Sequence, residues 1–211
     1  MRVVGSLRRV AAVAAATAVA TTCTTAMAET RPGTAVFVPL LGGPQSWRFD
    51  QWKAITDAVR GGVSTARLVP SDSGAKFQGN LDPSKLKAGF AGVNLDVGEL
   101  PRPLTDFVGL KLDVANSDGR EYTVLLKVRG GEAGSSYQVR FTPEPNQSME
   151  APFATFAAFR RGRPDPSAPQ LRAADVGTIA VQIASNFEEQ SGDYELELRG
   201  ISGLGGPEIH S

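Results

Sequence analysis

Short segments in which apolar and polar residues alternate constrain the fold of this chain more than any other feature. Residues 110–114 alternate Leu, Leu and Val with Lys and Asp, and residues 122–128 repeat the pattern with Tyr, Val, Leu and Val. A period of two is typical of a strand with one face buried and the other in solvent. The same period returns at residues 137–141, 179–183 and 194–198. These segments predict strands that share one core.

Other segments give weaker signals. Further strands are expected at residues 36–41, 63–69, 76–80 and 89–93. Residues 46–59 mix helical and extended spacings, which predicts an irregular segment with at most one helical turn. A brief helical turn is expected at residues 171–175, and a strand end running into a loop is expected around Phe153, Phe156 and Phe159. The sequence therefore offers many short strands and little helix.

A turn signal separates the two strongest alternating segments. Asn116-Ser117-Asp118-Gly119 contains the residue types that favour tight turns. Residues 110–114 and 122–128 are therefore expected to form a hairpin.

Strands of this number and spacing predict an all-β protein, an antiparallel β-sandwich or jelly roll. The predicted domain plan is a targeting peptide at residues 1–28, a loose lead-in at 29–45, one sandwich domain at 46–203 and a flexible tail at 204–211. No repeat of fixed period and no long linker divides the chain of 211 residues.

The first 28 residues have the composition of a targeting segment. Arg2, Arg8 and Arg9 precede an apolar run at residues 10–20, and Ala26-Met27-Ala28 offers a signal peptidase site. We expect an exported protein, periplasmic or secreted, cleaved near Ala28. Import into a mitochondrion or plastid is the alternative, because the leader is rich in Arg and Ala and free of acids. The apolar run is shorter than the roughly 20 residues of a membrane span, so no stable span is expected in the mature chain.

The residues that most enzymes use are scarce. Cys23 lies in the leader, and His210 is the only histidine. Cys–His pairs, Ser–His–Asp triads and His-based or Cys-based zinc sites are therefore not expected, nor is any cofactor. Carboxylates remain, and a glycosidase or lyase would need two of them across a cleft. The candidates are Asp57, Asp72, Asp96, Glu99, Asp106, Asp118, Glu121, Asp193, Glu195 and Glu197, and their spacing singles out no pair.

Charge argues against nucleic acid as a partner. The whole chain has a formal charge of zero, and loss of the three leader arginines would leave the mature chain at −3. The cluster of Arg160, Arg161 and Arg163 is interpreted as a solvated loop. Glu195 and Glu197 alternate with apolar residues, so they are expected to cover the solvent face of a strand.

Several short motifs occur in a consistent order along residues 47–201. Trp52, Asp57, Gly61, Gly62 and Ser64 resemble the pattern W-x(n)-D-G-x-x-GG-x-S, with Ala58 in place of a glycine. The other matching pieces are Phe77-Gln78-Gly79, Ala88-Gly89-Phe90-Ala91, Phe107 to Leu112, Asp118-Gly119-Arg120-Glu121-Tyr122, Ala151-Pro152-Phe153-Ala154-Thr155-Phe156 and Gly192 to Leu198. In this order they resemble the CIA30 family, the domain of complex I intermediate-associated protein 30.

The resemblance implies a galactose-binding-like β-sandwich, close to that of some carbohydrate-binding modules. It also implies a non-enzymatic role, because family members assist the assembly of respiratory complex I. The motif residues are carried over as a binding or structural set. For Gly61 and Gly62 we expect positive φ, a bulge or close backbone approach, with Asp57 and Ser64 bonding the turn. A binding role for Asp57 and Ser64 is the alternative.

Three functions remain open. The favoured one is a non-catalytic domain that docks a protein partner during assembly of a complex, which predicts an exposed apolar patch. A carbohydrate-binding module predicts exposed aromatic side chains on a sheet face, with Trp47 and Trp52 as the candidates. A carboxylate enzyme predicts two acids in one cleft.

Overall fold

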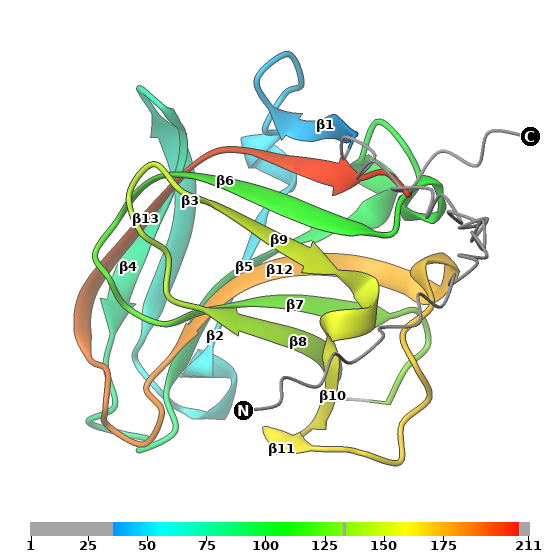
Figure 1. Cartoon of the computed structure of the whole chain (residues 1–211). Helices are drawn as coiled ribbons and strands as arrows, with labels where there is room; N and C mark the ends of the chain where they lie inside the picture. The colour runs from blue at the N-terminus through cyan, green and yellow to red at the C-terminus, as the bar shows by residue number, and fades with distance from the viewer. Residues whose placement is uncertain (1–35, 133, 207–211) are drawn as a thin grey trace, which may run out of the picture. The chain divides into compact units, whose positions relative to one another are not determined.

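Two antiparallel sheets face each other in the computed structural model, which describes residues 36–132 and 134–206 (Figure 1). The first sheet has the order β3 (Thr65–Ser71), β4 (Gly74–Leu81), β13 (Gly192–Leu204), β6 (Gly109–Ser117) and β9 (Ser148–Pro152), and β1 (Phe37–Gly42) also pairs with β13. The second has the order β11 (Arg163–Pro164), β10 (Ala157–Arg160), β8 (Ser135–Phe141), β7 (Tyr122–Val128), β12 (Val176–Ala184), β5 (Phe90–Asp96) and β2 (Lys53–Thr56). The predicted all-β sandwich is confirmed.

Helical structure in the described residues is confined to six short 3-10 turns. They are η1 (Phe49–Gln51), η2 (Asp57–Arg60), η3 (Val97–Glu99), η4 (Leu104–Asp106), η5 (Phe153–Thr155) and η6 (Ala173–Asp175). The turn expected at residues 171–175 is η6. Within the same residues, no helix has the length and apolar character needed to cross a membrane.

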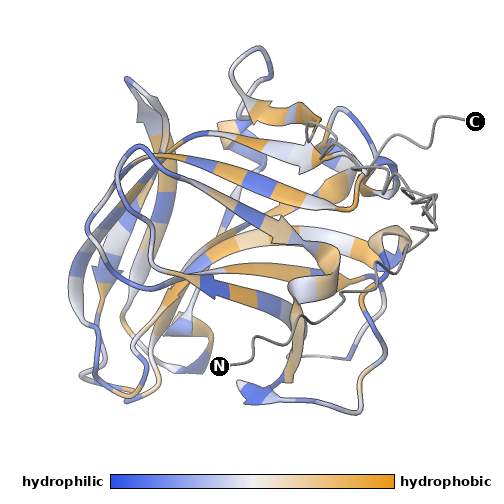
Figure 2. Cartoon of the chain, in the orientation of Figure 1, coloured by the Kyte–Doolittle hydropathy of each residue, from blue (hydrophilic) through white to orange (hydrophobic). Residues whose placement is uncertain are grey.

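The period-two alternation places every second side chain in the core between the sheets. Leu110, Leu112 and Val114 of β6 are buried, whereas the residues between them lie closer to solvent. The resulting alternation of colour is visible along β6 in Figure 2. Strands predicted at residues 36–41, 63–69, 76–80 and 89–93 all overlap observed strands.

The predicted hairpin between residues 110–114 and 122–128 is wrong. These segments are β6 and β7, and they belong to different sheets. β6 pairs with β13 and β9, whereas β7 pairs with β8 and β12. Both strands face the same core from opposite sides, so both show the same alternation, and the turn between them is a crossing from one sheet to the other.

Two segments are more ordered than predicted. The part of the lead-in that the structure describes contains β1, whose Leu40 and Leu41 are buried, so it belongs to the sandwich and is not loose. The segment 46–59 was expected to be irregular but contains β2 as well as two 3-10 turns. At the other end, Leu204 closes β13 and is buried, so the sandwich extends one residue into the predicted tail. The predicted leader, residues 1–28, lies outside the described residues.

An aromatic cluster joins the two sheets. Phe77 of β4 and Tyr194 of β13 come from the first sheet, with ring centroids 5.0 Å apart. Tyr122 of β7 comes from the second sheet, and its centroid lies 6.1 Å from that of Phe77. Edge-to-face and tilted pairs of this kind add stabilisation beyond the burial of their area.

Candidate functional site

Asp57 lies at one end of the sandwich, where three loops meet. Its side chain is 0% exposed. One carboxylate oxygen accepts hydrogen bonds from the Ser64 hydroxyl at 2.7 Å and the Phe90 N–H at 3.2 Å, and the other accepts the Ser64 N–H at 3.0 Å. The Ser64 hydroxyl also accepts the N–H of Asp82 at 3.0 Å. The carboxylate therefore ties the η2 turn to the start of β5 and, through Ser64, to the end of β4.

The adjacent glycines have separate tasks around this carboxylate. Gly61 ends the η2 turn with φ at +85°, a conformation that L side chains rarely adopt, and its N–H donates to Ala58. A Cβ at Gly62 would lie 2.2 Å from Oδ1 of Asp57, and one at Gly89 would lie 2.9 Å from Oδ2. Gly61 thus supplies the turn conformation, whereas Gly62 and Gly89 leave room for the Asp57 carboxylate.

Asp118 anchors the crossing between β6 and β7. Its Oδ1 accepts hydrogen bonds from the Tyr122 hydroxyl at 3.0 Å and the Arg120 N–H at 3.1 Å, and its Oδ2 accepts the Glu195 N–H at 3.1 Å. Arg120 closes the arrangement with a 3.2 Å ion pair to Oδ2 and a hydrogen bond to the Ser191 carbonyl. Burial raises the pKa of Tyr122, and Asp118 raises it further, so the phenol stays protonated as a donor.

The other motif residues are packing or turn elements. The core holds Trp52, Phe77, Tyr122, Phe153 and Phe156. Gly119 has φ at +76° with open space around it, and a Cβ at Gly79 would lie 2.1 Å from the Thr65 carbonyl oxygen. Half-buried Phe90 lies 5.3 Å below the Arg60 guanidinium, and the Pro152 carbonyl accepts the Thr155 hydroxyl.

The motif residues do not all converge on one cleft, although three of the motifs meet at one surface hollow, which is lined by Gln78, Gly79, Asp118, Asp193, Tyr194 and Glu195. Asp57, Gly61, Gly62, Ser64, Gly89 and Phe90 form one cluster, and Asp118, Arg120 and Tyr122 form a second one. Pro152, Phe153 and Phe156 belong to a third region at the end of β9. Trp47 and Trp52, considered above as platforms for a sugar, are 7% and 9% exposed and belong to the core, so that expectation is wrong for both.

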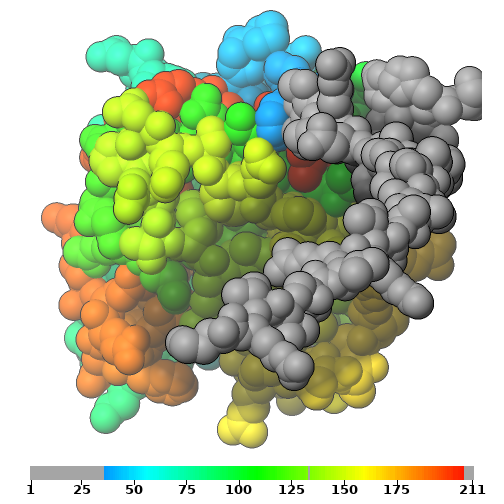
Figure 3. Space-filling model, viewed as in Figure 1, coloured from blue at the N-terminus to red at the C-terminus, as the bar shows by residue number. Residues whose placement is uncertain are grey.

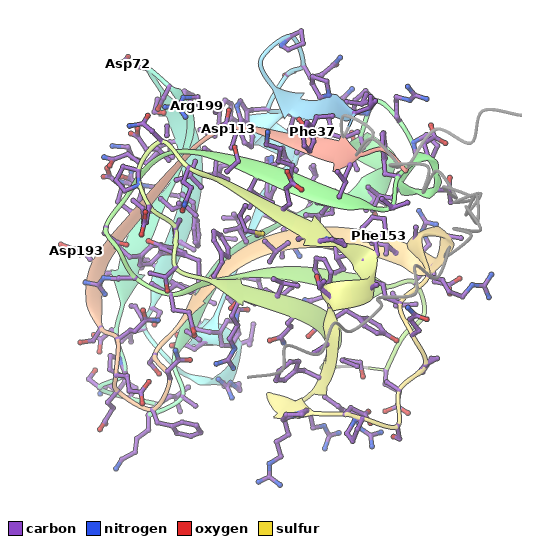
Figure 4. The ribbon with its side chains drawn as sticks, in the orientation of Figure 1. Phe37, Asp72, Asp113, Phe153, Asp193 and Arg199 are labelled. Carbon is purple, nitrogen blue, oxygen red and sulfur yellow. The ribbon has the colours of Figure 1, made fainter. Side chains whose placement is uncertain are left out.

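A surface hollow of about 640 Å³ gathers three acids over β3, β4 and β13. They are Asp118, Asp193 and Glu195. Asp193, which projects from the outer side of β13 in Figure 4, accepts a 2.8 Å hydrogen bond from Asn80. Glu195 lies 3.1 Å from the ammonium group of Lys76. Each of these acids is engaged by a hydrogen-bond donor or a cation of the protein itself.

Charged side chains cover the outer face of the first sheet. Lys76 pairs with Glu195 and Glu197, which confirms that these acids lie on the solvent side of β13. Asp113 and Arg199 pair at 3.2 Å on the same sheet (Figure 4). Within residues 36–132 and 134–206, no group of three His, Cys, Asp or Glu residues is arranged to hold a metal ion.

Gln190 and Ser185 also hold loops in place, and none of the sequence motifs pointed to them. Gln190, between β12 and β13, donates to the carbonyls of Ala184 and Glu121 and accepts the Glu121 N–H. Ser185 is fully buried, and its hydroxyl donates to the Lys87 carbonyl at 2.8 Å. The cluster Ser185-Asn186 marks a loop by composition, but its partners are distant in sequence and could not be read from it.

Comparisons with known proteins agree with this framework. Residues 42–198 match the family model described as Complex I intermediate-associated protein 30 (CIA30). A relative in Schizosaccharomyces pombe, uncharacterized protein C9E9.15, is 35% identical over 181 residues, which cover 78% of this chain and 83% of that protein.

Solved structures share the fold at low sequence identity. The family 11 carbohydrate-binding module from Clostridium thermocellum, solved with a β-1,3-1,4-mixed-linked tetrasaccharide, is similar with a TM-score of 0.55 and 19% identity, over 82% of this chain and 98% of that one. The family 11 module of the cellulosomal cellulase Lic26A-Cel5E from the same organism gives 0.53 and 18%, over 86% and 100%. This likeness shows the fold alone, whereas the family match covers more than half of the residues. The chain therefore belongs to the CIA30 family.

Proposed function

We propose that this chain is a non-catalytic binding domain that docks a protein partner during the assembly of a complex. Membership of a family named for a complex I intermediate supports this role. The observation that carries the proposal is that Asp57, the acid of the first family motif, is fully buried and accepts hydrogen bonds from Ser64 and Phe90. Its oxygens hold loops in place and are not directed at a substrate, whereas Asp118 lines a surface hollow and joins the crossing between the two sheets to β13. A fixed scaffold that presents loops is suited to recognition.

Affinity capture under native conditions tests the docking role. The tagged mature protein should recover a defined partner, and cells that lack the protein should accumulate a partly assembled complex containing that partner on native gels. Re-expression of the wild-type chain should restore the mature complex. Turnover of a substrate by the purified protein, or normal assembly in cells that lack it, would contradict the proposal.

From the composition of residues 1–28 we also propose that the protein is exported from the bacterial cytoplasm, with the mitochondrion or plastid lumen as the alternative. Export would separate the protein from an assembly task on the matrix side of complex I, so an envelope or thylakoid component is the proposed partner. Sequencing the N-terminus of the protein purified from its native host should find Glu29 as the first residue. An intact Met1 in the mature protein would contradict this address.

A carbohydrate-binding role is the second candidate, and the outer face of the second sheet favours it. Asn94 of β5 and Gln182 of β12 lie outward on neighbouring strands, and their amides make no side-chain hydrogen bond to the described residues. Half-buried Phe159 of β10 lies on the same face, 5.9 Å from the Arg140 guanidinium. Amides beside an aromatic ring suit the hydroxyls and apolar faces of a sugar.

Titration with soluble β-glucan and galactan oligosaccharides tests this second role. Binding should weaken at least about tenfold in Phe159→Ala and Gln182→Ala, because each removes a group that faces the ligand. Glu150→Gln, on the first sheet, is the matched control. Absence of binding across a glycan array would remove this candidate and leave the protein-docking role untouched.

A further inference from the structure

Phe187 lies in the loop between β12 and β13 and is 81% exposed. Asn186, Phe187 and Glu188 have φ values of +47°, +60° and +77°. Three successive non-glycine residues in the left-handed region are costly, and such conformations persist where the surroundings enforce them. The backbone of this loop is therefore held in a conformation that presents the phenyl ring to solvent.

Hydrogen bonds fix both ends of the loop. Asn186 donates to the Glu121 carboxylate at 2.9 Å, and Gln190 donates to the Glu121 carbonyl at 3.2 Å while accepting its N–H at 2.8 Å. The Ser185 hydroxyl donates to the Lys87 carbonyl. These bonds join the loop to the connection between β6 and β7 and to the connection between β4 and β5. The exposure of Phe187 is thus built into the fold.

A surface hollow of about 550 Å³ lies beside this loop. Asp82, Pro83, Lys85 and Lys87 line it from the β4–β5 connection. Glu188 and Ser191 line it from the loop, and Gly192 lines it from the start of β13. Figure 3 shows the two segments together at the lower left of the molecule, the loop in orange and the connection in blue-green. A projecting aromatic side chain and a recess therefore neighbour each other on one surface.

Charges of both signs surround this surface. Lys85, Lys87, Glu188 and Glu189 are exposed, and none forms an ion pair with a described residue. The two glutamates directly follow Phe187, which disfavours insertion of the ring into an anionic membrane. With Asp82 also at the hollow, the surface carries cations and anions side by side, and such a surface is instead self-complementary between two copies.

We propose that this surface binds a second copy of the chain. A two-fold contact uses the same surface on both copies, so every contact occurs twice. The Phe187 ring of each copy can therefore enter the hollow of the other. The lysines at the hollow then face the glutamates beside the incoming ring. A buried aromatic anchor surrounded by polar groups is typical of the centre of a protein interface. Dimerisation of this kind is independent of the proposed partner docking.

Sedimentation velocity of the purified mature protein over a broad range of concentrations tests the proposal. The protein should shift from monomer to dimer as concentration rises. Phe187→Ser should raise the dimer dissociation constant about tenfold or more, because it removes the anchor. The matched control is Val108→Ser, which changes an apolar side chain of 46% exposure that precedes β6 and leaves this loop intact. It should dimerise like the wild type. At concentrations at which the wild type is monomeric, both exposed substitutions should leave the unfolding midpoint unchanged.

Exchanging the charges gives a sharper test of the two-fold geometry. One variant carries Lys85→Glu and Lys87→Glu, and the other carries Glu188→Lys and Glu189→Lys. Each should be monomeric by itself, because like charges would meet across the contact. An equimolar mixture should form a one-to-one heterodimer. Addition of Phe187→Ser to both variants should abolish it, which separates docking from simple charge attraction.

Three results would overturn the inference. The first is a wild-type monomer at every concentration, and the second is a dimer that Phe187→Ser and the charge exchanges leave unchanged. The third is a photo-cross-linker at position 187 that reacts with a different protein or with phosphatidylserine vesicles and never with a second copy.

Discussion

Asp57 is the residue on which the loop end of the sandwich depends, because it is fully buried and accepts three hydrogen bonds. Its removal leaves the N–H groups of Ser64 and Phe90 without their acceptor. We expect Asp57→Ala to lower the free energy of unfolding by about 3 kcal/mol, given the cost of losing buried bonds to an acidic side chain. Urea unfolding followed by circular dichroism measures this loss.

Exposed Asp72 of the β3–β4 turn provides the control for this prediction. Asp72→Ala should change the free energy of unfolding by less than about 0.5 kcal/mol, as surface substitutions usually do. If the two variants were equally stable, Asp57 would not be the anchor that its contacts indicate.

The two glycines next to this acid should respond differently to alanine. Gly61→Ala meets open space but must adopt φ at +85°, which costs about 1 kcal/mol. Gly62→Ala places a methyl group 2.2 Å from the Asp57 carboxylate, so it should cost more. In the background of Asp57→Ala the carboxylate is absent, and the added loss from Gly62→Ala should shrink. A double-mutant cycle by urea unfolding measures this coupling, and strict additivity would contradict it.

Sequence could predict part of this site, for reasons that differ between residues. Two glycines in succession are costly unless the backbone needs them, so Gly61 and Gly62 pointed to a special turn. Trp47 and Trp52 carried no such signal, because an aromatic residue in a segment of mixed period can lie on either side of a sheet. The exposure of Phe187 could not be predicted from sequence either, because it depends on hydrogen bonds between segments that are distant in the sequence.

Ion pairs, as well as backbone hydrogen bonds, join the neighbouring strands β4 and β13 on the outer face of the first sheet. Lys76 of β4 lies 3.0 Å from Glu197 of β13. The Ser73 hydroxyl, and then Lys76, lower the pKa of Glu197 below its ordinary value. An acid whose pKa is lower in the folded state stabilises the fold above its ordinary pKa, and this contribution is lost as pH falls through the folded value.

Stability against pH tests this pairing of β4 and β13. As pH falls through the acidic range, the urea midpoint of the wild type should fall more steeply than that of Glu197→Gln, which has no carboxyl group to titrate at this position. Glu144→Gln, at an exposed position without an ion pair to a described residue, should follow the wild-type curve. Parallel curves for all three proteins would show that Glu197 does not stabilise the sheet.

Element prediction from sequence succeeded for strands and failed for their partners. Alternation reports which side chains are buried, and it identified β6 and β7 because each has one face on the core. It does not report the neighbouring strand, and two strands on opposite sides of one core carry the same pattern. The crossing depends on Asp118, whose bonds to Tyr122 and to Glu195 link the two sheets. That information lies in contacts far apart in the chain.

At the scale of the whole molecule, the two sheets share one core and should unfold together. The Phe77, Tyr122 and Tyr194 rings connect β4 and β13 of one sheet to β7 of the other. Both tryptophans lie in the same core, so their fluorescence reports tertiary packing while far-ultraviolet circular dichroism reports the strands. A single domain of this size with one core is expected to show coincident transitions by the two methods.

Phe77→Ala tests this coupling between the sheets. The substitution removes a fully buried ring from the centre of the aromatic cluster and should cost about 3–5 kcal/mol, while Phe77→Leu, which leaves a smaller cavity, should cost less. Because Phe77 contacts both sheets, the fluorescence and circular dichroism midpoints should move to lower urea by the same amount. Val36→Ala, at a position 47% exposed, should leave both midpoints in place. Separation of the two transitions in Phe77→Ala would mean that each sheet has a stability of its own and that the core does not couple them.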